Sequence, residues 1–121
     1  MSQIFLLFGA IFAGLSVILG AFAAHGLKNR LSEYALGVFQ TGVEYQMYHA
    51  LGLILIGILA KLGMQFNLSG YFMIAGILLF SGSLYALALT GIKWFGPITP
   101  IGGLCFIVAW AAMIVKLLQM K

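Results

Sequence analysis

The stretch "TGVEYQMYHALGLILIGILA", residues 41–60, is almost wholly apolar and contains one charged side chain, Glu44. A helix needs about 20 such residues to cross about 30 Å of hydrocarbon. Residues 4–24, 69–90 and 98–118 form three more apolar stretches of similar length. They lack the alternation of β-strands, and only helices or closed barrels satisfy the backbone in lipid. The sequence predicts an all-α integral membrane protein, a bundle of four transmembrane helices in one domain covering residues 1–121.

The composition agrees with this class. Hydrophobic residues make up 64% of the chain and charged residues 7%, whereas charged residues approach about a quarter of a soluble domain. The first apolar stretch lacks the basic start of a signal peptide and is too long for one. We therefore expect it to be retained as a transmembrane helix.

The basic residues lie in the connections and near the C-terminus. They divide equally between the two sides: Lys28, Arg30 and Lys93 on one, and Lys61, Lys116 and Lys121 on the other. The positive-inside rule therefore leaves the orientation open. The formal charge of +4 is spread over both interfaces, where Lys and Arg anchor a protein in the lipid bilayer. Without a concentrated basic tract, we expect no nucleic-acid partner.

The second helix is expected to begin before its apolar run. Ser32 is a favourable N-cap, and the charge of Glu33 in the first turn suits the helix dipole. From Ser32 to Leu62 such a helix is about 45 Å long at about 1.5 Å per residue, so its first turns are interfacial or tilted. With Lys61 at the opposite interface, Glu44 lies only about one turn below the near one.

Polar side chains occupy two faces of this helix. A rotation of about 100° per residue places Gln40, Glu44 and Tyr48 along one line, while Gln46 and His49 project to nearly the opposite side. Exposing such groups to lipid is costly. We therefore expect neither face to contact lipid.

Other helices supply polar groups at the same depth. In the expected topology all of them lie on the side of the first and third loops. The predicted polar cluster consists of His25, Gln40, Glu44, Tyr45, Gln46, Tyr48, His49, Ser81, Ser83, Tyr85 and Thr99. Lys28 and Arg30 are candidate ion-pair partners of Glu44, which needs a partner in hydrocarbon. The cluster is either a proton- or cation-handling site or a structural knot that locks the helices together.

Metal binding and catalysis are disfavoured. Glu44 and His49 diverge by about 140° on a helix, so they cannot share an ion without a kink. No Ser-His-acid arrangement appears, and Asp is absent. The single cysteine, Cys105, is expected to be packed and inert. We therefore predict no metal, no cofactor and no enzyme activity.

Small residues at four-residue spacing indicate close helix packing. The expected packing positions are Ser16, Gly20, Ala24, Gly82, Ala86, Pro100, Gly102 and Gly103. The segments "SVILGAFAAHGLK" (residues 16–28) and "SGSLYALALTGIK" (residues 81–93) also match at several positions with equal spacing. This internal similarity favours two helical hairpins of like orientation, as in transporters with parallel repeats.

Four segments carry a family resemblance: "GAFAAHGL", "FQTGVEYQMYHALGL", "FSGSLYALALTG" and "TPIGG". They resemble the signature stretches of the YgdD/YwdK-like family, small bacterial membrane proteins classed as a domain of unknown function. The resemblance covers nearly the whole chain. It implies a four-helix protein of the bacterial inner membrane, and it implies no established activity or substrate.

Three functional hypotheses follow. The first is a non-enzymatic protein that forms homo-oligomers or serves as an accessory subunit, with the polar cluster specifying packing. The second is a small proton- or cation-coupled transporter or channel that uses Glu44. The third is a lipid- or small-ligand-binding protein. The sequence leaves the protein partner, the oligomer number and any transported ligand open.

Overall fold

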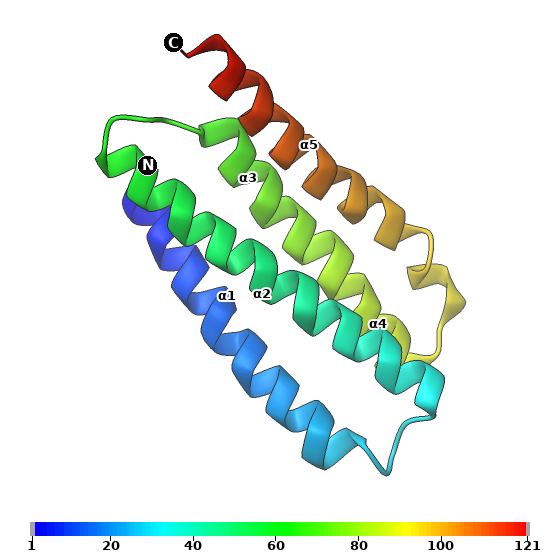
Figure 1. Ribbon diagram of the computed structural model, residues 1–121. Coiled ribbons are helices and arrows are strands. Elements are labelled where there is room, and N and C mark those ends of the chain that lie inside the picture. Colours follow the sequence, from blue (N-terminus) through cyan, green and yellow to red (C-terminus); the bar gives the residue numbers. More distant parts are fainter. Residues whose placement is uncertain (1, 121) are drawn as a thin grey trace.

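The computed structural model describes residues 2–120, which form four membrane-length spans joined by short connections (Figure 1). In order, the elements are α1 (Ser2–Phe22) with the π-helical segment η1 (Ala23–Leu27), α2 (Glu33–Lys61), α3 (Asn67–Gly76) with the π-helical segment η2 (Ile77–Ser81) and α4 (Gly82–Thr90), the 3-10 turn η3 (Lys93–Phe95), and α5 (Ile98–Gln119). The third span is thus α3, η2 and α4 in sequence. The predicted all-helical, four-span membrane fold is confirmed.

Local signals fix the helix ends. The Ser32 hydroxyl accepts a hydrogen bond from the Ala35 amide at 3.1 Å, which confirms the predicted N-cap of α2. The third span ends at Gly91, whose φ of 72° is left-handed; glycine adopts this conformation without the strain a Cβ would bring. Pro97 precedes α5 and Pro100 lies in its first turn, where the missing amide hydrogen removes no helical hydrogen bond.

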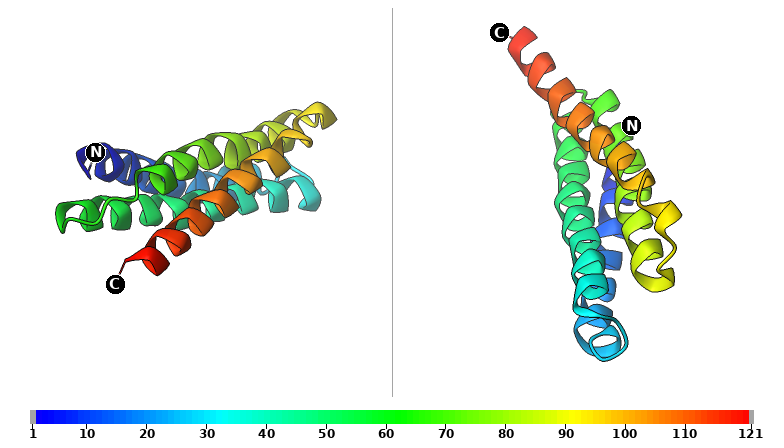
Figure 2. Two further views of the ribbon diagram at one scale, coloured as in Figure 1. Left: turned by 90° about the horizontal axis from the view of Figure 1, so that it is seen from above. Right: turned by 90° about the vertical axis from the view of Figure 1, so that its right-hand side faces the viewer.

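The second and third spans form the centre of the molecule. In their most apolar windows 44% and 39% of residues are buried, against 17% and 22% in the first and fourth spans. Helix α1 packs along α2, and α5 packs on α3 and η2. Figure 1 shows the spans in chain order, and Figure 2 shows α5 crossing the others at an angle. The outer spans therefore present most of their surface to lipid.

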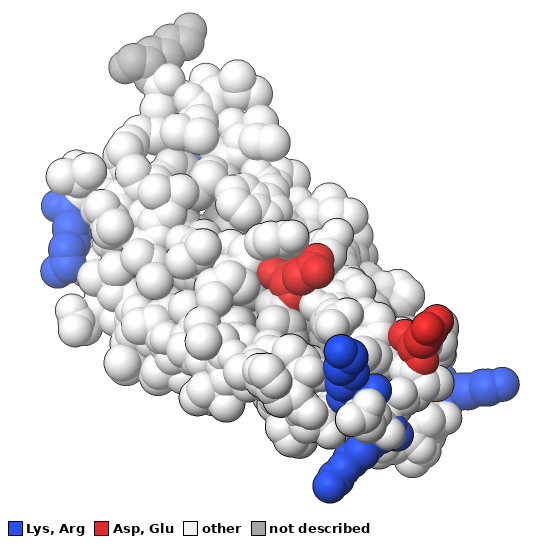
Figure 3. Space-filling model, turned by 60° about the horizontal axis from the view of Figure 1, so that its bottom comes forward, with Lys and Arg blue, Asp and Glu red and all other residues white. Residues whose placement is uncertain are grey.

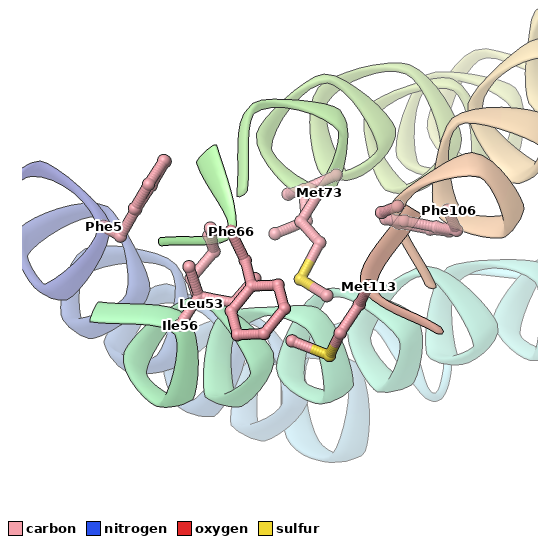
Figure 4. Close-up of a cluster of buried hydrophobic side chains, with 9 residues drawn as sticks. Phe5, Leu53, Ile56, Phe66, Met73, Phe106 and Met113 are labelled. Atoms are coloured by element: carbon pink, nitrogen blue, oxygen red, sulfur yellow. The ribbon is translucent and has the colours of Figure 1, made fainter. Parts of the chain in front are cut away.

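A buried apolar cluster ties three of the spans to α2, and Figure 4 shows its members converging between the helices. They include Phe5, Leu53, Ile56, Phe66, Met73, Phe106 and Met113. A smaller cluster near the opposite end contains Ala23, Leu27, Phe39 and Ala88. Burial of a large apolar side chain in a water-soluble protein stabilises it by removing surface from water, but in lipid the gain comes from dispersion contacts between closely fitted helices.

Glycines permit this close fit at positions that differ in part from the predicted ones. A Cβ at Gly102 would overlap the backbone nitrogen of Phe80, so α5 touches η2 backbone to backbone there. At Gly20 a Cβ would meet Val43 at 3.5 Å, an ordinary contact, and at Gly82 it would meet nothing within 4 Å. Ala24 is exposed, whereas Ser16 is buried. The small-residue spacing alone does not show which face of a helix meets a neighbour.

Candidate functional site: two polar faces of α2

The inner face of α2 is centred on Gln46, whose side chain is 3% exposed. Its amide nitrogen donates to the carbonyl oxygen of Phe12 on α1 at 2.8 Å. Its amide oxygen accepts a hydrogen bond from the Tyr85 hydroxyl on α4 at 2.6 Å. The Phe12 carbonyl also accepts from Ser16 at 2.8 Å. One side chain of α2 thereby joins the first and third spans.

His49 joins α2 to the fourth span. The indole nitrogen of Trp110 donates to His49 Nε2 at 3.0 Å, and His49 Nδ1 lies 2.8 Å from the carbonyl oxygen of Tyr45. Because an indole can only donate, Nε2 is the acceptor and Nδ1 carries the hydrogen. The ring also stacks on Phe106 with centroids 3.6 Å apart. Both nitrogens are occupied, so His49 is a neutral, fully bonded side chain.

Two serines of the third span complete this inner network. Ser81 in η2 donates to the Gly42 carbonyl of α2 at 2.7 Å. Ser83 donates to the Phe80 carbonyl at 2.9 Å and lies 2.6 Å from the Thr99 hydroxyl. Since the single hydroxyl hydrogen of Ser83 goes to Phe80, Thr99 is the donor between the two side chains. The inner face therefore links all four spans by hydrogen bonds.

The outer face of α2 has no such hydrogen-bond partners in the described part of the chain. Gln40, Glu44 and Tyr48 are exposed, and the line continues as exposed Leu51 and Leu55. Figure 3 shows both acidic side chains of the chain at the surface on one side of the molecule. This differs from the sequence-based expectation that both polar faces would be covered, because α1 and the third span pack on α2 and leave its outer face exposed.

Glu44 makes no ion pair and no hydrogen bond within residues 2–120. Lys28 and Arg30, the expected partners, are exposed in the connection between η1 and α2 and do not reach it. The reason is geometric, because Glu44 lies about 16 Å along the helix from Glu33 at about 1.5 Å per residue. A charged side chain left unpaired within a membrane span is costly.

His25 also lies apart from the inner network. It belongs to the π-helical segment η1 and is exposed. Glu44 and His49 emerge on different sides of α2, so they do not share a site. No group of three or more metal-ligating side chains occurs among residues 2–120.

An open groove of about 760 Å³ lies between α2 and α5. We call it the α2–α5 groove. Its walls are formed by Tyr45, His49, Phe80, Pro100, Gly103, Leu104, Phe106, Ile107, Trp110, Ala111 and Ile114. The Tyr45 ring packs on Phe80 with centroids 4.9 Å apart and on Tyr48 with centroids 5.6 Å apart. Tyr45 thus stands at the border between this groove and the outer face of α2.

Sequence reasoning did not identify Trp110 or the Phe12 carbonyl as parts of the network. Trp110 carried a usable signal, because an indole N–H within a membrane span needs an acceptor, and His49 was a polar group within reach of the same leaflet. The Phe12 carbonyl carried no signal in the sequence, since every residue of a helix has a backbone carbonyl. The π-helical segments also have no distinctive composition.

These features define a small four-span membrane protein with a bonded polar network inside and an acidic outer face on its longest helix. The chain belongs to the family described as "Protein of unknown function (DUF423)", whose model matches residues 19–103. It is a multi-pass bacterial membrane protein with four candidate spans, and its relatives are named as membrane proteins of bacteria. No family or relative name found describes a catalytic activity.

Two relatives illustrate the similarity. The chain is 49% identical over 117 residues to the UPF0382 membrane protein YwdK of Bacillus subtilis, covering 93% of this chain and 94% of the relative. It is 46% identical over 115 residues to the UPF0382 membrane protein SH2409 of Staphylococcus haemolyticus, covering 94% of each. No solved structure matches the chain.

Proposed function

We propose that this protein is a non-enzymatic membrane protein that self-associates, and that a second copy covers the outer face of α2. The observation that carries the proposal is the exposed carboxylate of Glu44, which has no partner among residues 2–120, on a span whose buried polar side chains, Gln46 and His49, are bonded. Gln40 and Tyr48 flank it and offer hydrogen-bond donors to a facing carboxylate. The polar network on the inner face is then structural.

The energetics favour association over lipid exposure. A charged side chain at the centre of a bilayer costs about 2.5–3.5 kcal/mol on insertion scales, and less near the interface. A two-fold related copy brings its own Gln40 and Tyr48 toward Glu44, because a C2 interface places the same surface patch on both sides. Leu51 and Leu55 extend this contact toward the other leaflet with apolar packing. Hydrogen bonding and packing then replace lipid contact.

Disulfide crosslinking in native membranes tests the interface. In a Cys105→Ala background, Leu51→Cys places a thiol on the outer face of α2, where Leu51 is 54% exposed. Leu78→Cys is the matched control, because Leu78 is 60% exposed but lies on η2, in the third span. We expect an oxidised dimer from Leu51→Cys and little from Leu78→Cys. Equal crosslinking at both positions, or none at Leu51, would contradict the proposed interface.

Cation or proton transport is the second candidate function. The outer face favours it because its polar line starts at Glu33, at the membrane surface, and passes Gln40 to reach Glu44 before closing at Leu51. Between two copies this line would form an access path from one side. The test is flux into proteoliposomes containing the wild type or Glu44→Gln at equal insertion, beside protein-free liposomes. Flux that is lost in Glu44→Gln supports transport, and flux equal to that of protein-free liposomes excludes it.

A further inference from the structure

The α2–α5 groove is longer than one leaflet of a bilayer. Its lining on α5 runs from Pro100 to Ile114, a distance of about 21 Å at about 1.5 Å per residue. Half of a hydrocarbon core is only about 15 Å thick. The acyl chain of a phospholipid, confined to one leaflet, would leave part of the groove unfilled. A longer linear chain would fill it.

The two ends of the groove differ in chemistry. Aromatic rings gather in the half of the groove nearer the third loop, where Tyr45, His49, Phe80 and Phe106 contact one another. Trp110 follows one turn further along α5, and the far end beyond it is lined by Ala111 and Ile114. No Lys, Arg, Asp or Glu lines the groove, so nothing in its walls matches a phosphate or an ammonium group.

One polar group in the groove remains available to a ligand. The Tyr45 hydroxyl makes no hydrogen bond within residues 2–120, and the residue is 39% exposed. His49 is not available, because Trp110 and the Tyr45 carbonyl already occupy its two nitrogens. A ligand here is therefore offered flat aromatic surfaces, a single hydroxyl donor and a long apolar channel.

We propose that the α2–α5 groove binds a prenylated quinone. The quinone ring packs against the aromatic end of the groove and accepts a hydrogen bond from the Tyr45 hydroxyl through a ring carbonyl. Gly103 leaves room beside Phe80 for the ring, and the isoprenoid tail follows α5 toward Ile114, past the small side chain of Ala111. The proposal concerns binding alone and does not depend on self-association, since the groove and the outer face are separate surfaces of α2.

Fluorescence of Trp110 reports occupancy directly, because Trp110 lines the groove. The chain has two tryptophans, and Trp94→Phe removes the other one, which is 71% exposed on η3. The protein is reconstituted in phosphatidylglycerol nanodiscs and titrated with a naphthoquinone bearing a prenyl tail. We expect saturable quenching by this quinone. The same naphthoquinone without its tail should bind at least about tenfold more weakly, or about 1.4 kcal/mol, because it lacks the dispersion contacts that a tail packed along the groove makes.

Variants separate binding in the groove from quinone dissolved in the bilayer. Gly103→Leu projects a side chain into the groove, and its Cβ would meet Phe80 at an acceptable 3.7 Å. Gly14→Leu is the matched control, because a Cβ at Gly14 meets nothing within 4 Å on α1. We expect Gly103→Leu to abolish saturable quenching and Gly14→Leu to preserve it. Tyr45→Phe should weaken binding about three- to tenfold, the effect of one hydrogen bond.

Three results would overturn the proposal. Linear, unsaturable quenching shows partitioning into the lipid, and equal quenching in Gly103→Leu places the quinone elsewhere. Equally effective displacement of the quinone by a free fatty acid assigns the groove to ordinary acyl chains. A failure of the Leu51→Cys crosslink would leave each of these readouts unchanged. Quinone binding and self-association are therefore tested independently.

Discussion

At the scale of single residues, Gln46 and Gln40 show how the same side chain has opposite roles on two faces of one helix. Gln46 is buried and bonded to α1 and α4, whereas Gln40 is exposed. The sequence placed both in the polar cluster, and the opposite projection of Gln46 was predictable from helical rotation. Which face would be covered by the chain itself was not predictable, because both faces carry comparable polar groups.

Replacing these glutamines by leucine should separate the two roles. Gln46→Leu removes two interhelical hydrogen bonds and leaves the Tyr85 hydroxyl without its partner. We expect a loss of about 1–2 kcal/mol in unfolding free energy, given that such bonds in membranes average about 0.6 kcal/mol and reach about 1.7 kcal/mol. Gln40→Leu should leave the unfolding free energy of the monomer within about 0.5 kcal/mol of the wild type. Denaturation in mixed detergent micelles measures both, and equal effects would contradict the structural role of Gln46.

His49 and Trp110 provide a second test at this scale. Their hydrogen bond joins α2 to α5 beside the stack of His49 on Phe106. A double-mutant cycle of His49→Phe and Trp110→Phe should give a coupling of about 0.6 kcal/mol or more in unfolding free energy. Additive effects of the two changes would show that the bond contributes nothing to the fold.

At the scale of elements, hydrophobic length predicted the four spans and the Ser32 cap predicted the start of α2. The π-helical segments η1 and η2 were not predicted, because a wider turn follows from packing rather than from local composition. In η2 the consequence is specific: the segment holds Phe80 against Gly102 and directs Ser81 to the Gly42 carbonyl. The sequence identified Ser81 as a polar group of the site. It did not predict the π-helical backbone that directs Ser81 toward α2.

The contact between η2 and α5 is testable with two neighbouring glycines. Gly102→Ala forces a methyl group against the backbone of Phe80, which cannot move as a flexible side chain would. Overpacking of this kind costs about 1–3 kcal/mol of unfolding free energy. Gly103→Ala is the control, because its added Cβ would lie 3.7 Å from Phe80, an ordinary contact. Thermal unfolding of the two purified variants should therefore differ, and similar melting temperatures would contradict the close approach.

At the scale of the whole molecule, some polar side chains of the spans have hydrogen-bond partners inside the protein and others do not. Hydrogen bonds inside the molecule satisfy Gln46, His49, Ser81 and Ser83, while Glu44 is turned outward and has no partner among residues 2–120. The sequence predicted which side chains are polar within the spans, and it did not predict their division into an inner and an outer set. That division depends on which face of α2 the other spans pack against. Hydropathy does not contain this information.

The central claim is that Glu44 drives self-association, and subunit counting by single-molecule photobleaching in bilayers tests it most directly. The labelled protein is diluted into increasing amounts of lipid, beside Glu44→Leu. We predict dimers or larger assemblies for the wild type, and association at least about tenfold weaker for Glu44→Leu, corresponding to about 1.4 kcal/mol, because leucine needs no partner in lipid. Monomers at every dilution, or equal association of the two proteins, would contradict the account.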